Sequence, residues 1–222
     1  MPGVAVNILQ EPLCITSYNS TGFGIGAQQF LSTLSTFSNI ICLQEHFLLD
    51  SNDKKHSNTN KLRKFFSTKY DMFIIPAYKD NLQVSKGRGK GGLATMWDKS
   101  LTKYVSLVKC SSFRLQATKF SFPSGSFLLF NTYFPCDPRT VRFNETELLS
   151  LLAEIKNILY QEGCLYNLIS GDLNCHFLRK STFTLIIENF FKDIQFNIFW
   201  GNPDHTPGQL SVQRQADLNF HH

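Results

Sequence analysis

The chain has 222 residues, of which 42% are hydrophobic, so it is long enough to bury a full core in a single domain spanning residues 1–222. Its formal net charge of +5 and its pI near 8.9 favour a polyanionic partner over an acidic protein or a neutral metabolite. No apolar run approaches the ~20 residues that a membrane span requires, and the first residues lack a secretory leader pattern. We therefore expect a soluble protein without a membrane partner.

The cysteines indicate a reduced environment. The chain contains six, far apart in the sequence and without a Cys-x-x-Cys pair. This spacing suggests neither a zinc ribbon nor a disulfide-rich secreted scaffold, and it fits an intracellular location, nuclear or cytoplasmic. Cys14 and Cys42 lie in apolar runs, so we expect them to be small core residues.

The first half of the chain alternates short apolar runs with polar or glycine-containing segments, which predicts strands separated by helices and loops. The run at 40–44 is short and rich in isoleucine, so it predicts a buried strand. The other expected elements are strands at 13–17, 72–76 and 93–97, helices at 27–34 and around 62–66, and loops at 50–60 and 79–92.

The second half predicts a hairpin and one long helix. Residues 122–126 read as a tight connection between two strands, which implies antiparallel pairing. Asn144 and Glu147 have the spacing of a capping box, and the apolar residues that follow lie at helical spacing as far as Gly163. Mixed strands and helices with hairpins indicate a layered α/β domain. The expected elements are strands at 104–110, 114–122, 126–133 and 168–171, helices at 144–163 and 182–191, and the beginning of a last strand at 217–220.

The sharpest chemical signal is Ser170-Gly-Asp-Leu-Asn-Cys175, which follows a buried strand. Asp172 and Asn174 are two residues apart, so in an extended segment their side chains point into the same cleft. The aspartate can orient or deprotonate water, and the amide can donate to a phosphoryl oxygen without adding negative charge. The alternative is a turn in which both side chains bond to nearby backbone.

Further polar side chains follow other predicted strands. Glu45 comes just past the strand at 40–44, where a lone carboxylate suits a hard cation such as Mg²⁺, although it could equally be a surface acid. Asn19 and Tyr133 end two more strands, and Tyr133 considered alone fits a half-buried core aromatic. We assign no role to His46, which we expect at the surface.

A basic glycine-rich segment, Lys86-Gly-Arg-Gly-Lys-Gly-Gly92, precedes the strand at 93–97. Its glycines remove steric bulk and Arg88 and Lys90 attract polyanions, so the segment could approach a phosphate backbone. It is not a Walker loop, because no Gly-Lys-Ser/Thr opens a helix. The alternative is a solvated flexible loop.

Several motifs follow one another along the chain: Asn19, Gln44-Glu45, the glycine-rich stretch at 87–92, Asn131-Thr-Tyr133-Phe-Pro135 and Gly171-Asp172-Leu-Asn174. In this order they resemble the successive motifs of the endonuclease/exonuclease/phosphatase family. Leu-Gln-Glu-His-Phe-Leu at 43–48 and Gly-Arg-Gly-Lys-Gly-Gly-Leu-Ala at 87–94 resemble LINE-type retrotransposon endonucleases in particular. The resemblance spans roughly residues 13–220.

This resemblance implies a four-layered α/β sandwich, in which two packed mixed sheets are flanked by helices and the site lies at one edge. It also implies metal-assisted hydrolysis of a phosphodiester. By the same resemblance, Glu45 ligates Mg²⁺ or Mn²⁺ with Asn19 beside it. Tyr133 contacts the scissile phosphate, Asp172 positions or activates water, and Asn174 binds a phosphate oxygen.

The end of the chain departs from the family pattern. Asp217 resembles the late aspartate that supports the family's catalytic imidazole, but the Ser-Asp-His motif that carries this imidazole is absent. His221 and His222 lie too close to Asp217 to replace it, and Cys136 stands where the family has an asparagine. We therefore expect a C-terminally truncated domain that lacks its last strand. Loss of a catalytic acid or base commonly removes ~10²- to 10⁴-fold of rate.

Three functional hypotheses follow. The first is a Mg²⁺-dependent DNA endonuclease of retrotransposon origin, with no small-molecule cofactor beyond the metal. The second is a catalytically impaired remnant that binds nucleic acid, because the imidazole motif is absent. The third is a phosphatase or phosphodiesterase acting on a small or lipid phosphate, because relatives use the same apparatus on those substrates.

Overall fold

The computed structural model describes residues 13–50, 52, 58–78, 89–135, 143–164, 166–175, 177 and 181–196. Two mixed four-stranded sheets form its centre. The first sheet consists of β1 (Ile15–Asn19), β2 (Ile40–Gln44), β3 (Tyr70–Ile75) and β4 (Leu93–Asp98), in the order β1-β2-β4-β3. The second consists of β5 (Val105–Val108), β6 (Leu115–Phe122), β7 (Gly125–Tyr133) and β8 (Tyr166–Asp172), in the order β5-β6-β7-β8.

Each sheet contains one parallel pair, and a helix connects its two strands. β1 and β2 are joined by α1 (Ile25–Ser35), and β7 and β8 are joined by α3 (Phe143–Glu162). Parallel neighbours need such a crossover because the chain must return to the same end of the sheet. Two further helices are α2 (Asn60–Phe66) and α4 (Thr182–Asp193).

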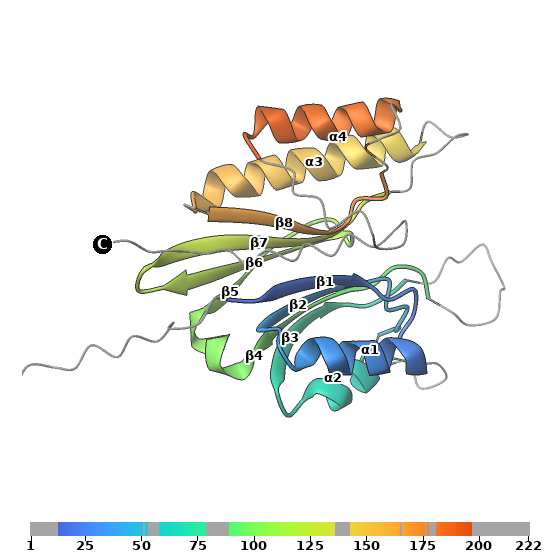
Figure 1. Ribbon diagram of the computed structural model, residues 1–222. Coiled ribbons are helices and arrows are strands. Elements are labelled where there is room, and N and C mark those ends of the chain that lie inside the picture. The colour runs from blue at the N-terminus through green and yellow to red at the C-terminus, as the bar shows by residue number, and fades with distance from the viewer. Residues whose placement is uncertain are drawn as a thin grey trace, which may run out of the picture.

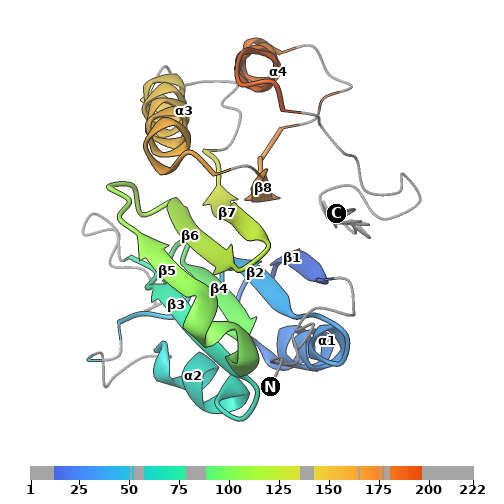
Figure 2. The same cartoon turned by 90° about the vertical axis from the view of Figure 1, so that its left-hand side faces the viewer.

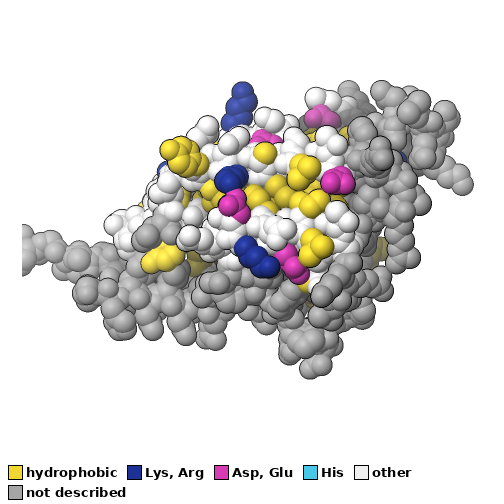
Figure 3. Space-filling view, turned by 90° about the horizontal axis from the view of Figure 1, so that it is seen from above, with side chains coloured by type: hydrophobic (Ala, Val, Ile, Leu, Met, Phe, Trp, Pro, Cys, Tyr) yellow, Lys and Arg dark blue, Asp and Glu magenta, His cyan; other side chains and the backbone are white. Residues whose placement is uncertain are grey.

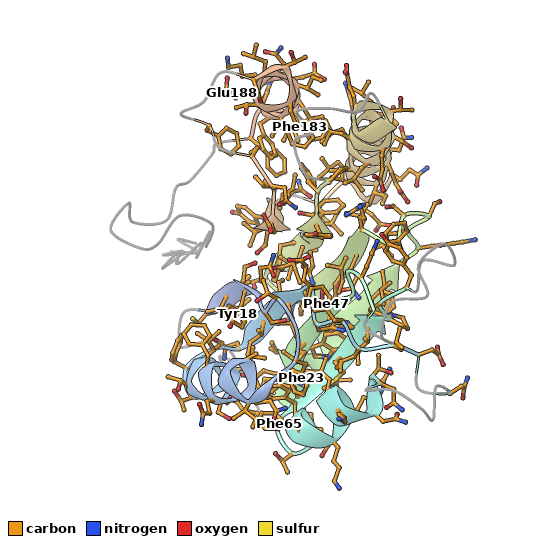
Figure 4. The ribbon with its side chains drawn as sticks, turned by 90° about the vertical axis from the view of Figure 1, so that its right-hand side faces the viewer. Tyr18, Phe23, Phe47, Phe65, Phe183 and Glu188 are labelled. Atoms are coloured by element: carbon orange, nitrogen blue, oxygen red, sulfur yellow. The ribbon has the colours of Figure 1, made fainter. Side chains whose placement is uncertain are left out.

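The elements form four layers, with α3 and α4 on one sheet, α1 and α2 on the other, and the two sheets facing each other between them (Figures 1 and 2). Three hydrophobic clusters fill the three spaces between the layers. On the α4 side, Phe183, Ile187 and Phe191 repeat every four residues and are buried in the cluster beneath the helix. Figure 4 shows Phe183 on the side of α4 that faces the protein. The predicted four-layered α/β sandwich is confirmed.

Successive side chains of a strand point to opposite faces of the sheet, so one short strand contributes residues to two hydrophobic clusters. In β2, Ile41 and Leu43 pack toward the α1–α2 layer, whereas Ile40 and Cys42 face the second sheet. β7 behaves likewise, because Phe130 packs toward α3 while Leu129 faces the first sheet. Both faces of these strands are therefore apolar, as expected for central strands covered on both sides.

Toward one end of the sandwich the space between the sheets becomes polar. The Asn131 side chain is fully buried there, and its Oδ1 accepts a 2.7 Å hydrogen bond from Gln44 Nε2. Asn131 Nδ2 donates to the Ala94 carbonyl and to Gln116 Oε1, at 3.1 and 3.2 Å. Gln116 Oε1 also accepts from the Thr95 hydroxyl at 2.8 Å. This buried amide network of Gln44, Thr95, Gln116 and Asn131 links four strands from both sheets.

The segment after β2 is held by His46, which is fully buried and not at the surface as expected. Its Nδ1 accepts a hydrogen bond from the Leu48 amide at 3.0 Å, so the ring proton lies on Nε2 and is donated to the Ile75 carbonyl at 3.2 Å. Gly92 makes room for the ring, because a Cβ at this position would lie 2.5 Å from His46 Cε1.

Gly89 is also required by packing, since its Cβ would lie 2.7 Å from the Ala77 Cβ. Two glycines of the basic segment thus face protein atoms. Their presence is explained by the fold and does not need a phosphate.

The observed elements occur in the predicted order, with bounds that differ by a few residues. The main difference is a 3-10 helix, η1 (Lys99–Tyr104), which the sequence did not predict. The Asp98 side chain accepts from the Ser100 amide, which stabilises this turn. β5 begins one residue later and ends two residues earlier than the strand expected at 104–110. The expected strand start at 217–220 lies outside the described residues. In the part of the chain that the structure describes, no helix has the length and apolar character to cross a membrane.

Replacing Asn131 by leucine is expected to lower the free energy of unfolding by roughly 2–5 kcal/mol, because Gln44 and Gln116 lose buried partners. Urea denaturation of the wild type and variant measures the loss. Gln29→Leu, an exposed amide on α1, is the matched control and should change stability little. A loss for Asn131→Leu no larger than that of the control would contradict the role assigned to the network.

Burial lowers the pKa of His46 from 6.5 to about 4. Between pH 6.5 and about 4, His46 therefore binds a proton in the unfolded chain but not in the folded chain. The free energy of unfolding should fall as the pH drops through this range. For His46, the free energy of unfolding falls by about 3 kcal/mol across this range. Denaturation curves across this pH range check the prediction, and His46→Gln should flatten the dependence. An unchanged pH dependence in His46→Gln would show that other groups cause it.

Candidate active site

Four strands bring polar side chains to the same edge of the sandwich. β1 and β2 end in register, with Asn19 paired with Gln44, and Glu45 follows directly. β7 and β8 also end in register, with Tyr133 paired with Asp172. Because each pair is parallel and the two sheets face each other, all four carboxyl ends meet at this edge (Figure 1).

Asn19 joins two carboxylates from different sheets. Its Nδ2 donates to Glu45 Oε2 at 2.8 Å and to Asp172 Oδ2 at 2.7 Å. The Tyr133 hydroxyl donates to Glu45 Oε1 at 2.7 Å. Asn19 is itself held by the Thr21 amide, which donates to Asn19 Oδ1 at 3.0 Å. Glu45, Asp172, Asn19 and Tyr133 thus form one half-buried cluster.

The position of Asp172 depends on Gly171. The backbone of Gly171 has φ +135, and a Cβ there would lie 2.0 Å from the Thr132 carbonyl oxygen. Only glycine, which has no Cβ, allows β8 to approach β7 this closely near the end of the strand. Glu45, with φ +52, and Asn174, with φ +49, also have left-handed backbone conformations. Such conformations are uncommon for side-chain-bearing residues and concentrate at functional sites.

The pKa of the Asp172 carboxyl is raised, and burial is the largest cause. The negative charge of Glu45 raises it further, whereas hydrogen bonds from the Asn174 amide and the Asn19 side chain lower it. Two carboxylates this close repel each other, so the site as it stands favours a neutralising positive charge.

Asn174 lies beside Asp172, but part of its hydrogen-bonding capacity is used within the protein. Its backbone amide donates to Asp172 Oδ1 at 2.9 Å, and its side-chain Nδ2 donates to the Phe134 carbonyl at 2.7 Å. An amide NH₂ has two N–H donors, so one remains for a ligand oxygen. The Asn174 side chain therefore ties β7 to the segment after β8.

The donor set of the cluster fits a hard divalent cation. Glu45 and Asp172 offer carboxylate oxygens, the ligand type that Mg²⁺ prefers, whereas Asn19 directs its amide nitrogen toward both carboxylates. Among the described residues, no group of three or more His, Cys, Asp or Glu side chains could hold a metal ion. Mg²⁺ typically takes only one or two protein carboxylates and fills its other positions with water and phosphate, so the two carboxylates suffice.

The site residues that were predicted from the sequence lie in different places. Asn19, Glu45, Tyr133, Asp172 and Asn174 lie together in this cluster. Lys90 is exposed and lies at the base of the β3–β4 connection, where its backbone pairs with that of Tyr78. Arg88 and Asp217 lie outside the described residues.

Arg114 was not predicted from the sequence to lie near this site. Its guanidinium carbon lies 5.0 Å from the centre of the Tyr133 ring, and its Nε donates to Glu147 of α3 at 2.7 Å. The side chain is only 14% exposed. No local motif distinguishes Arg114 from the other basic residues of the chain. Its proximity to Tyr133 follows from the β6–β7 register, which places Leu115 opposite Thr132.

Comparison with known proteins rests on structure. No protein-family model matches the chain, and no curated protein matches it in sequence. Among solved structures, an AP endonuclease from Leishmania major matches with a TM-score of 0.59 and 13% identity, covering 81% of this chain and 66% of that chain, slightly less than two thirds. A 3' phosphatase, NExo from Neisseria, bound to product DNA hairpin, matches with a TM-score of 0.56 and 13% identity over 81% of this chain and 70% of that chain.

The endonuclease domain of TRAS1, a telomere-specific non-LTR retrotransposon, also matches. Its TM-score is 0.53 at 11% identity, and the match covers 82% of this chain and 71% of that chain. At such low identities these similarities concern the fold. The four layers, the strand order and these neighbours together show that the chain has the endonuclease/exonuclease/phosphatase fold.

Proposed function

We propose that this chain is a Mg²⁺- or Mn²⁺-dependent phosphodiesterase that cleaves DNA and derives from a retrotransposon-type endonuclease. The observation that carries the proposal is the Glu45–Asn19–Asp172 bridge, which holds two carboxylates from different sheets around one amide. The net charge of +5 supports a polyanionic substrate. The neighbours described as an AP endonuclease, a retrotransposon endonuclease domain and a DNA-bound 3' phosphatase support phosphodiester hydrolysis as the reaction.

Glu45 would hold the cation in this proposal, with the Asn19 amide and the Asp172 carboxylate beside it. A bound divalent cation would neutralise charge on the phosphate and make a bound water more acidic. Asp172, which lies next to Glu45 across the Asn19 amide, accepts the proton of the attacking water. Tyr133 donates its hydroxyl proton toward a phosphate oxygen, and the second N–H of Asn174 binds another oxygen.

The imidazole of the family pattern has no substitute in His46. Both ring nitrogens of His46 are engaged by backbone groups, and the ring is buried under Gly92. Within the described part of the chain, we therefore assign proton transfer at this site to Asp172 and Tyr133.

Asp172→Asn should lower the rate of plasmid nicking in Mg²⁺ by ~10²- to 10⁴-fold, because the amide cannot accept the proton of the water. Conversion of supercoiled plasmid to open circle measures the rate. Asp193→Asn, on the exposed surface of α4, is the matched control and should nick like the wild type. Equal rates for Asp172→Asn and wild type would refute the proposed role of Asp172. Salt-dependent DNA binding by a wild type that never nicks would instead favour the non-catalytic remnant.

Millimolar Mg²⁺ should raise the thermal unfolding midpoint of the wild type, because an ion that binds only the folded chain stabilises it. Glu45→Gln should lose most of this shift, since it removes one of the paired carboxylates. Glu188→Gln on α4, far from the cluster, should retain it (Figure 4). Differential scanning fluorimetry with and without EDTA measures the effect. A full shift in Glu45→Gln would place the cation elsewhere.

A further inference from the structure

Two aromatic side chains from different sheets meet at the surface beside the candidate active site. Tyr78 follows β3 and Phe113 lies in the β5–β6 connection, and their ring centres are 4.9 Å apart at an interplanar angle of 64°. Tyr78 is 40% exposed and Phe113 is 44% exposed. The rings contact each other, yet large parts of both remain in water.

A chain of contacts connects this pair to the carboxylates. The Arg114 guanidinium carbon lies 5.3 Å from the Phe113 ring centre and 5.0 Å from the Tyr133 ring centre. Tyr133 in turn donates its hydroxyl proton to Glu45. Tyr78, Phe113, Arg114, Tyr133 and Glu45 therefore form a continuous row from the surface to the site.

The pair is supported by ordered backbone. Tyr78 and Lys90 exchange two backbone hydrogen bonds, of 3.1 and 2.9 Å, which fix the start of the β3–β4 connection. The Arg114 carbonyl accepts from the Tyr133 amide at 3.0 Å, which fixes the end of the β5–β6 connection. Lys90 is exposed next to Tyr78 in this backbone pair, and on the other side of the rings the Glu154 carboxylate accepts from the Ser111 and Ser112 amides.

We propose that Tyr78 and Phe113 form a stacking platform for an unpaired nucleobase adjacent to the cleaved phosphodiester. The inference rests on the proposed function, which places the phosphate at Glu45 and Tyr133. Aromatic rings stack on any base face, while nearby Lys and Arg hold the backbone phosphates. In an intact duplex the base faces are covered by neighbouring base pairs, so the platform selects a single-stranded, flapped or mismatched nucleotide.

The connection to the candidate active site distinguishes the Tyr78–Phe113 pair from the other exposed apolar surface of the protein. The outer face of α3 and α4 also exposes large apolar side chains, including Tyr160, but there acidic and basic side chains are interspersed (Figure 3). In contrast, the Tyr78–Phe113 pair is connected through Arg114 and Tyr133 to the candidate active site. Tyr160→Ala therefore provides a control that removes an exposed aromatic ring from a different surface.

Fluorescence anisotropy tests the platform with EDTA present, so that binding is measured without cleavage. The probes are a labelled single-stranded oligonucleotide of about ten nucleotides and a hairpin duplex of the same sequence. Tyr78→Ala and Phe113→Ala should each bind the single strand about tenfold more weakly, without altering the dependence of binding on salt. Phe113→Tyr and Tyr160→Ala should retain wild-type affinity, and binding to the duplex should change by less than about twofold.

An oligonucleotide without bases provides a test that does not depend on protein variants. The wild type should lose about tenfold in affinity for this abasic strand, and Tyr78→Ala should show no further loss. The inference is overturned if both alanine variants bind the normal single strand like the wild type, or if they weaken duplex binding equally. Plasmid nicking is scored separately. A wild type that nicks while the aromatic variants bind normally refutes the platform alone, whereas absence of nicking with stacking intact refutes only the proposed reaction.

Discussion

The buried amide network between the sheets is the constraint on which the candidate active site depends. Gln44 directly precedes Glu45, and Asn131 lies two residues before Tyr133, so the 2.7 Å hydrogen bond between these amides sets how the two strand ends face each other. An apolar contact at this place would resist separation of the sheets but would tolerate sliding, because the hydrophobic effect has no direction. Hydrogen bonds have narrow limits of distance and angle, and in a dry interior an unmade one is costly. The sandwich therefore changes from apolar to polar toward the edge where geometry matters.

The same edge concentrates features that do not favour folding. Asp172 is held close to Glu45 with a raised pKa, and Glu45 and Asn174 have left-handed backbone conformations. Each feature costs free energy in the metal-free chain, and the packed layers on either side supply the stability that maintains them. A cation between the carboxylates would relieve the repulsion. Like-charge pairs of this kind are more easily understood as a prepared binding site than as part of the scaffold.

In the proposed function, the Tyr78–Phe113 pair binds the part of the substrate that lies next to the reacting phosphate. The fold brings Tyr78, which follows β3, against Phe113 in the β5–β6 connection. Because the pair is connected to Tyr133 through Arg114, a base stacked on it would lie next to a phosphate bound at the site. Neighbours that share this fold are described as an AP endonuclease and as a 3' phosphatase. Such surface connections are where proteins of one fold differ in their substrates.

The sequence by itself determined the element order, the two-faced apolar strands and the strand-end positions of Asn19, Glu45, Tyr133 and Asp172, because these features follow from local periodicity and local turn chemistry. Only the tertiary structure decided what these side chains contact. His46 was expected at the surface and is buried, and the glycines of the basic segment serve packing around His46 and Ala77. Arg114 and the Asn131 network were not found, since their partners lie in other strands and, for Asn131, partly in the other sheet. A contact between residues far apart in sequence has no local signature, and it exists only once register and sheet packing bring the two side chains together.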